Sequence, residues 1–131
     1  MEPSKGKKVL IVEDEAPTAL ALGDKFEAAG YTVLQAADGK EGLHTALAEH
    51  PDLMLVDLRL PKMSGLDLIR ELRKDAWGAD VKIMILTNVS DVESVDEAMR
   101  QNTFHYIVKG DTTMQSVLEK AESLLGDNTV Q

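Results

Sequence analysis

Five short apolar runs, each the length of a β-strand, recur along the chain and constrain its fold more than any other feature. They are rich in β-branched residues and are separated by longer amphipathic stretches, so each is predicted to be a strand. The runs cover residues 9–12, 31–34, 53–56, 81–86 and 106–108, with His105 leading into the last.

Between these runs, apolar residues recur every three or four positions, which is the spacing of one face of a helix. Five helices are therefore predicted to alternate with the five strands. Their apolar faces are Ala19, Leu22, Phe26 and Ala29; Leu43, Ala46 and Leu47; Leu66, Ile69 and Leu72; Val92, Val95 and Met99; and Met114, Val117, Leu118, Ala121 and Leu125.

Capping residues agree with this division. Gly30 can end the first helix in the left-handed conformation, and Pro51 closes the second. Ser90 or Asp91 is predicted to cap the start of the fourth.

Continuous apolar strands that alternate with helices predict a parallel sheet covered on both faces, which is a doubly wound α/β fold. In such folds ligands bind beyond the carboxyl ends of the strands, where the strand order reverses. The residues that end each strand are therefore the candidates for a functional site.

Length and charge restrict the function further. The 131 residues suffice for one domain, with a core expected over residues 8–125 and loose ends at 1–7 and 126–131. With 14 Lys and Arg against 23 Asp and Glu, the net charge of −9 disfavours direct binding to nucleic acid or anionic membranes. The absence of Cys excludes thiol chemistry and Cys-based zinc sites. No apolar run is long enough for a signal peptide or membrane span, so we expect a cytoplasmic protein.

Acidic, hydroxyl and ammonium groups stand at the predicted strand ends. Any one of them alone is more typical of a helix cap or a solvated loop, but together they predict a site. Glu13 and Asp14 follow the first strand, Asp57 the third, Thr87 the fourth and Lys109 the fifth.

Crowded carboxylates at this edge need a counter-ion. Two unit charges about 5 Å apart, such as Asp14 and Asp57, repel by roughly 3 kcal/mol at an effective dielectric constant near 20. Since the available ligands are hard oxygens, a divalent cation such as Mg²⁺ or Mn²⁺ fits best. Together with Lys109 and Thr87, these carboxylates could bind a phosphoryl group. A carboxylate oxygen of Asp57 would attack its phosphorus, and the product would be an acyl phosphate.

Four motifs in sequence order carry a family resemblance: VLIVEDE, LMLVDLRLPKMSG, MILTN and HYIVKG. From about Lys8 to Leu125 the chain resembles the receiver domain of two-component response regulators. The resemblance implies a flavodoxin-like sheet with strand order 2-1-3-4-5.

The same resemblance implies a role for each site residue. Asp57 would accept a phosphoryl group from a phosphohistidine on a sensor histidine kinase or histidine phosphotransfer protein. Mg²⁺ would be held by Asp14, Asp57 and the Arg59 carbonyl, with Glu13 acting through water.

Three further positions match residues that respond to the phosphoryl group. Lys109 would pair with the carboxylates and then with the phosphoryl oxygens. Thr87 and Tyr106 match the switch residues, whose movement changes the surface made by the fourth helix, fifth strand and fifth helix. This surface would contact a downstream effector protein or a second copy of the chain.

The chain also departs from the family pattern. Gly110 follows Lys109 where the family usually has Pro, and Asn88 follows Thr87 where a smaller residue is common. These departures motivate an alternative, a receiver fold used as a phosphorylation-independent interaction or dimerisation module. A flavin protein is disfavoured because residues 13–17 lack a phosphate-binding loop, and a phosphatase because Arg59 replaces its second acid.

The main hypothesis is therefore a phosphoacceptor signalling protein rather than an enzyme. It takes two forms: a stand-alone receiver that acts through a separate effector, and a receiver cut from a longer regulator, with residues 126–131 as part of a linker.

Overall fold

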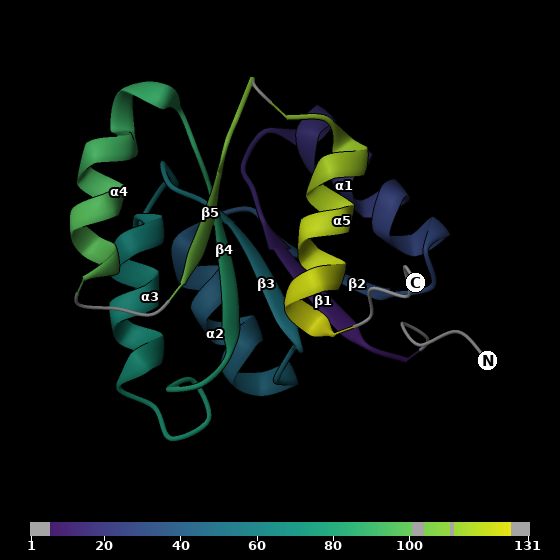
Figure 1. Cartoon of the computed structure of the whole chain (residues 1–131). Coiled ribbons are helices and arrows are strands. Elements are labelled where there is room, and N and C mark those ends of the chain that lie inside the picture. Colours follow the sequence, from purple (N-terminus) through teal and green to yellow (C-terminus); the bar gives the residue numbers. More distant parts are fainter. Residues whose placement is uncertain (1–5, 101–103, 111, 127–131) are drawn as a thin grey trace.

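A five-stranded parallel sheet forms the centre of the molecule, in the order β2-β1-β3-β4-β5 (Figure 1). The computed structural model describes residues 6–100, 104–110 and 112–126. The predicted loose ends fall mainly on residues 1–5 and 127–131, outside the described residues. The strands are β1 (Lys8–Val12), β2 (Thr32–Ala36), β3 (Leu53–Asp57), β4 (Lys82–Thr87) and β5 (His105–Val108).

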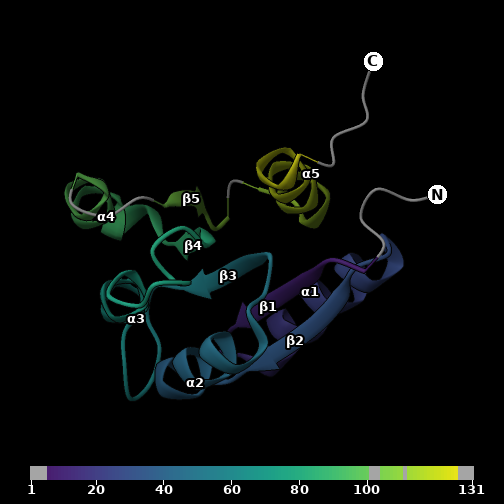
Figure 2. The same ribbon diagram turned by 90° about the horizontal axis from the view of Figure 1, so that it is seen from below.

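Helices connect the strands and cover both faces of the sheet (Figure 2). This arrangement confirms the predicted doubly wound α/β fold and its strand order. The helices are α1 (Ala16–Ala28), α2 (Gly39–Glu49), α3 (Gly65–Arg73), α4 (Val92–Met99) and α5 (Met114–Leu125), and a 3₁₀ turn, η1 (Val89–Asp91), precedes α4.

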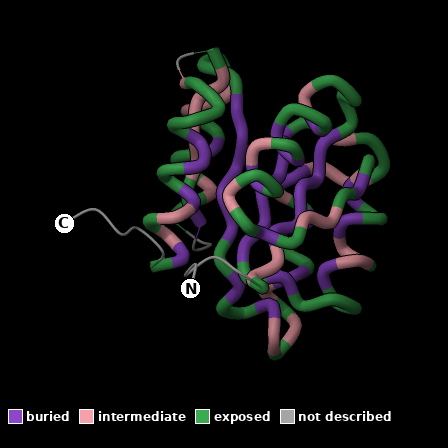
Figure 3. Tube along the Cα trace, turned by 90° about the vertical axis from the view of Figure 1, so that its right-hand side faces the viewer, coloured by how far each residue is buried: buried purple, intermediate pink, exposed green. Residues whose placement is uncertain are grey.

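Alternation along the strands divides the core into two apolar clusters, one on each face, because successive side chains point to opposite sides of a strand. Leu10 and Val12 of β1 pack with α2, α3 and α4, whereas Val9 and Ile11 pack with α1 and α5. The buried strands and the exposed outer surfaces of the helices are evident in Figure 3. Because side chains on both faces of the central strands are buried, the sequences of these strands are unbroken apolar runs.

Several strand boundaries differ from the prediction by one or two residues. Strand β2, predicted at 31–34, begins at Thr32 and reaches Ala36. Tyr31 lies outside it because its N–H donates to the Phe26 carbonyl at the end of α1. Strands β3 and β4 each extend one residue further, so Asp57 and Thr87 are the last residues of their strands.

The predicted caps are partly confirmed. Gly30 has a φ of 102°, a conformation that glycine adopts readily, and α2 ends before Pro51. The predicted side-chain cap of α4 is wrong. Asp91 does precede the helix, but it makes no capping hydrogen bond, because its carboxylate is bonded to Arg59.

Across the described part of the chain, every helix is too short or too polar to span a bilayer.

Candidate functional site

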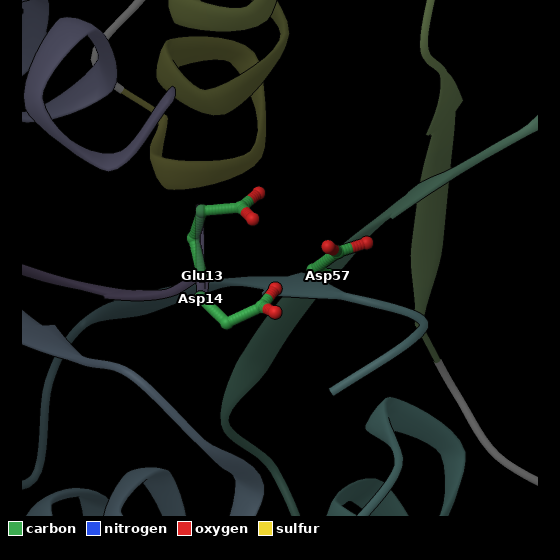
Figure 4. Close-up of side chains that lie close together, drawn as sticks. All are labelled: Glu13, Asp14 and Asp57. Atoms are coloured by element: carbon green, nitrogen blue, oxygen red, sulfur yellow. The ribbon is translucent and has the colours of Figure 1, made fainter. Parts of the chain in front are cut away.

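Strand register brings the predicted acidic residues together at the carboxyl edge of the sheet. Val12 pairs with Val56 across β1 and β3, so Glu13 and Asp57 follow as neighbours. One carboxylate oxygen from each of Glu13, Asp14 and Asp57 lies within 4.8 Å of the others. Figure 4 shows the three side chains projecting from adjacent strand ends.

Burial sets this edge apart from the rest of the molecule. Among the described residues, the buried polar or charged ones are Glu13, Asp57 and Thr87, at 3%, 6% and 1% exposure. Asp14 is exposed. Burying polar groups is costly, so three of them gathered at one edge of the sheet indicate a functional site.

Glu13 has the most perturbed ionisation at the site. Burial raises the pKa of Glu13 to about 7; the Glu15 N–H bond opposes this shift and the negative charge of Asp57 adds to it. Its Oε2 accepts the Glu15 N–H at 3.0 Å, whereas its buried Oε1 has no hydrogen-bond partner among the described residues. A buried carboxylate oxygen without a donor is poorly stabilised and suits a cation.

Lys109 supplies the positive charge. Thr87 pairs with Val108 across β4 and β5, so Lys109 follows at the same edge, and its N–H donates to the Thr87 carbonyl at 2.7 Å. Its Nζ lies 3.1 Å from Asp57 Oδ1 and 3.8 Å from Glu13 Oε1. Burial alone would lower the pKa of Lys109, but the hydrogen bond and charge of Asp57, together with the charges of Glu13 and Glu15, raise it. Lys109 therefore stays positively charged at neutral pH.

The donor set fits a hard divalent cation. Opposite ligands of Mg²⁺ lie about 4 Å apart, since each Mg–O bond is about 2.1 Å, and the three carboxylate oxygens lie within 4.8 Å of one another. A cavity of about 550 Å³, lined by Asp14, Arg59 and residues of the β3–α3 loop, opens beside Asp14. The cluster of Glu13, Asp14 and Asp57 can therefore hold a metal ion.

The two predicted switch residues lie on the adjacent strands β4 and β5 and have different partners. Thr87 is buried at the site and its hydroxyl donates to the Asn88 carbonyl at 3.2 Å. Tyr106 is half-buried and pairs with Ile85 of β4, two residues before Thr87. A hydrogen bond to Asp96 of α4 raises the pKa of Tyr106, so its phenol faces that helix.

The Arg59 side chain lies outside the acidic cluster and is bonded to Asp91. The contacts of Asp91 with Arg59 and of Asp96 with Tyr106 are not predicted by the sequence analysis. Arg59 and Asp91 are 32 residues apart, and no spacing rule connects them. The one available signal is topological: both follow strands that end at the same edge of the sheet.

Comparison with known proteins gives a consistent picture. A family model described as the response regulator receiver domain matches residues 9–121. The polar-differentiation response regulator DivK of Brucella ovis is 31% identical over 121 residues, which cover 92% of this chain and 98% of that protein. The probable transcriptional regulator ycf27 of Porphyridium aerugineum is 34% identical over 130 residues, which cover 95% of this chain and 53% of that protein.

Two other ycf27 proteins are also longer than the region that this chain matches. The chain spans 44% and 39% of the ycf27 proteins of Cyanophora paradoxa and Guillardia theta, so it corresponds to about half the length of these regulators.

Solved structures agree with the fold. A response regulator receiver domain protein from Clostridium thermocellum superposes with a TM-score of 0.83 at 27% identity, covering 92% of this chain and 94% of that one. The receiver domain of a sensor histidine kinase from Pseudomonas aeruginosa superposes with a TM-score of 0.81 at 26% identity, covering 92% and 98%. That structure has a magnesium ion coordinated in its active site cleft.

Proposed function

Because this chain belongs to the response regulator receiver domain family, we propose that it is a phosphoacceptor of two-component signalling, with Asp57 as the residue phosphorylated. The observation that carries the proposal is the position of Asp57. Its Oδ1 lies 3.1 Å from Lys109 Nζ, and its carboxylate belongs to a cluster that can hold a metal ion.

The transfer step follows from these groups. A carboxylate oxygen of Asp57 attacks the phosphorus of a phosphohistidine, and the P–N bond breaks. The electron pair of that bond goes to the imidazole nitrogen, which takes a proton, and an acyl phosphate forms on Asp57. Lys109, held as an ammonium, neutralises the phosphoryl oxygens as Asp57 loses its own charge to the new bond.

We assign the metal site to Mg²⁺, held by Asp14, Asp57 and the Arg59 carbonyl, with Glu13 reached through water. The buried Oε1 of Glu13, which has no hydrogen-bond partner among the described residues, supports this assignment. When bound, the ion supplies positive charge that offsets the repulsion among the carboxylates and the incoming phosphoryl group. The magnesium-containing relative from Pseudomonas aeruginosa supports the choice of metal.

The phosphoryl donor is then a sensor histidine kinase or a histidine phosphotransfer protein in the cytoplasm. Output follows from Thr87 and Tyr106, which respond to the phosphoryl group and alter the surface of α4, β5 and α5. This surface contacts an effector protein or a second copy of the chain. Direct contact with nucleic acid or membrane is not part of the proposal, because the net charge is −9.

The experiment is phosphorylation by a small donor. The protein is incubated with acetyl phosphate and Mg²⁺ and its intact mass is measured. We expect the wild type and Asp24→Asn, an exposed acid of α1, to gain one phosphoryl mass, and Asp57→Asn to gain none.

Two results would contradict the proposal: no gain in the wild type, or a gain that persists in Asp57→Asn. Binding to a partner that is unchanged by Asp57→Ala would favour the phosphorylation-independent module instead.

A further inference from the structure

An ion pair joins the loops that follow β3 and β4. Arg59 Nε donates to Asp91 Oδ2 at 2.9 Å and Arg59 Nη2 donates to Asp91 Oδ1 at 2.7 Å, so the contact is bidentate. The Asp91 side chain is only 13% exposed, whereas the Arg59 side chain is 71% exposed. Asp91 is therefore largely enclosed by the protein, whereas the Arg59 side chain lies mostly in solvent.

Backbone contacts connect Asp91 to Thr87. The Asp91 N–H donates to the Asn88 carbonyl at 3.0 Å, and the Thr87 hydroxyl donates to the same carbonyl at 3.2 Å. A hydroxyl has a single proton to donate, so Thr87 cannot also donate to a phosphoryl group on Asp57 while this bond persists. For Thr87 to do so, the turn at Asn88 has to rearrange.

We propose that the Arg59–Asp91 ion pair is a latch that holds the 88–91 turn in the arrangement that occupies the Thr87 hydroxyl. Both are positioning residues, and the inference rests on the proposed function. The latch opposes phosphorylation, because an interaction present in only one of two states shifts the equilibrium toward that state.

The position of Arg59 explains how the latch opens. Arg59 lines the same cavity as Asp14. Its hydrogen bond to Asp91 and, to a lesser extent, the negative charge of Asp57 raise the pKa of Arg59, so the guanidinium is within electrostatic reach of the acceptor. A phosphoryl group offers a guanidinium the same kind of bidentate oxyanion contact as a carboxylate. The entering group therefore competes with Asp91 for Arg59, and its binding releases the turn.

The test uses beryllium fluoride with Mg²⁺ as a phosphoryl analogue, and its dissociation constant is measured by calorimetry. We compare the wild type, Asp91→Asn, Arg59→Gln and the double variant. Breaking an exposed ion pair, worth about 1 kcal/mol at most, corresponds to a change of up to about fivefold in affinity, and a bidentate pair belongs to the upper part of that range. We expect Asp91→Asn to bind the analogue about three- to fivefold more tightly than the wild type, and to have no such effect in the Arg59→Gln background.

A charge control is needed because Asp91→Asn also removes a negative charge near the site. Glu93→Gln removes one from the first turn of α4, where the side chain is exposed. We expect Glu93→Gln to change the affinity by less than Asp91→Asn and equally in both Arg59 backgrounds.

The NMR chemical shift of the Thr87 methyl group distinguishes opening of the latch from a general structural effect of the substitution. The Thr87 methyl resonance of free Asp91→Asn should shift toward its position in the analogue-bound wild type, and Asp91→Ser should behave alike. Equal effects of Asp91→Asn with and without Arg59, or an unshifted Thr87 resonance, would overturn the latch alone. A wild type that does not bind the analogue, or an Asp57→Asn variant that does, would overturn the proposed function itself.

Discussion

At the scale of single residues, Glu13 is the group whose ionisation folding changes most. Its pKa rises from 4.5 to about 7 because the carboxyl group is buried. The folded protein therefore holds this proton more tightly than the unfolded chain. The stabilisation is fully present below pH 4.5 and is lost as the pH rises through 7.

Replacing Glu13 should remove this pH dependence. At pH 8 without metal, Glu13→Gln is expected to increase the free energy of unfolding by about 3 kcal/mol, since the pKa of Glu13 rises from 4.5 to about 7 on folding and each pKa unit corresponds to about 1.4 kcal/mol. The gain should fall to about 1 kcal/mol or less at pH 5 and vanish below pH 4.5, where Glu13 is protonated in both the folded and the unfolded chain. Urea denaturation in chelator at both pH values measures it, and a gain that is independent of pH would contradict the account.

Substitution of Asp14 tests the metal site without disturbing the core, because the Asp14 side chain is exposed. A ligand that binds only the folded state raises the melting temperature, so the wild type should be stabilised progressively by Mg²⁺. We expect Asp14→Asn to need at least about tenfold more Mg²⁺ for the same shift, the effect of losing about 1.4 kcal/mol of binding free energy. Differential scanning fluorimetry measures this.

The matched control is Asp24→Asn, which removes an exposed acid of α1 away from the strand edge. It should respond to Mg²⁺ like the wild type. Equal responses of all three proteins would exclude Asp14 from the metal site.

The positions of these residues could be predicted because strand ends meet at one edge of a parallel sheet. That rule brings Asp57 and Lys109 together, and their side-chain atoms lie 3.1 Å apart. The ion pair of Arg59 with Asp91 could not be predicted, since it depends on the conformation of two loops. The helix-cap rule was misleading for Asp91, because its carboxylate has a stronger, charged partner.

At the scale of elements, the prediction was most accurate for the central strands and least accurate for β2. Strand β2 is an edge strand, so polar and exposed residues such as Gln35 occur within it and interrupt the apolar pattern. Tyr31 is apolar and buried but belongs to the turn after α1. The other edge strand, β5, lacks such an interruption and matches its predicted residues.

The start of α3 fixes the strand end that carries Asp57. A Cβ atom added at Gly65 would lie 2.6 Å from the Asp57 carbonyl oxygen and 3.1 Å from Leu58 Cα, both of which are backbone atoms. Gly65→Ala is expected to lower the free energy of unfolding by about 1–3 kcal/mol and to slow phosphorylation of Asp57 by acetyl phosphate. Chemical denaturation and the rate of mass gain measure the two effects.

Ser64→Ala is the control, because Ser64 caps the same helix through a hydrogen bond from the Asp67 N–H at 3.2 Å. It should cost about 1 kcal/mol of stability and leave the phosphorylation rate unchanged. Equal rates for Gly65→Ala and Ser64→Ala would show that the contact at Gly65 does not position Asp57.

At the scale of the whole molecule, one sheet lies between two apolar clusters and contributes residues to both. Leu22 belongs to the cluster under α1 and α5, whereas Trp77 packs against the cluster under α2, α3 and α4. Since the same strands contribute to both, we predict that the two clusters unfold together, as expected for a single domain.

Leu22→Ala tests this coupling, because it removes a side chain with 2% exposure and should lower the free energy of unfolding by about 3 kcal/mol. Trp77 fluorescence and far-ultraviolet circular dichroism should report the same shifted denaturation midpoint. A fluorescence midpoint that stays at the wild-type value would divide the chain into two independent units.

The place of β5 at the border of the sheet, bonded to β4 alone, has a mechanical consequence. The acceptor lies on a strand held by hydrogen bonds on both sides, so the chemistry occurs on a stiff support. Tyr106 lies on a strand with one such neighbour, so a small displacement there disturbs a single ladder. In the proposed phosphoacceptor, Asp57 would therefore lie on the more restrained strand and Tyr106 on the less restrained one.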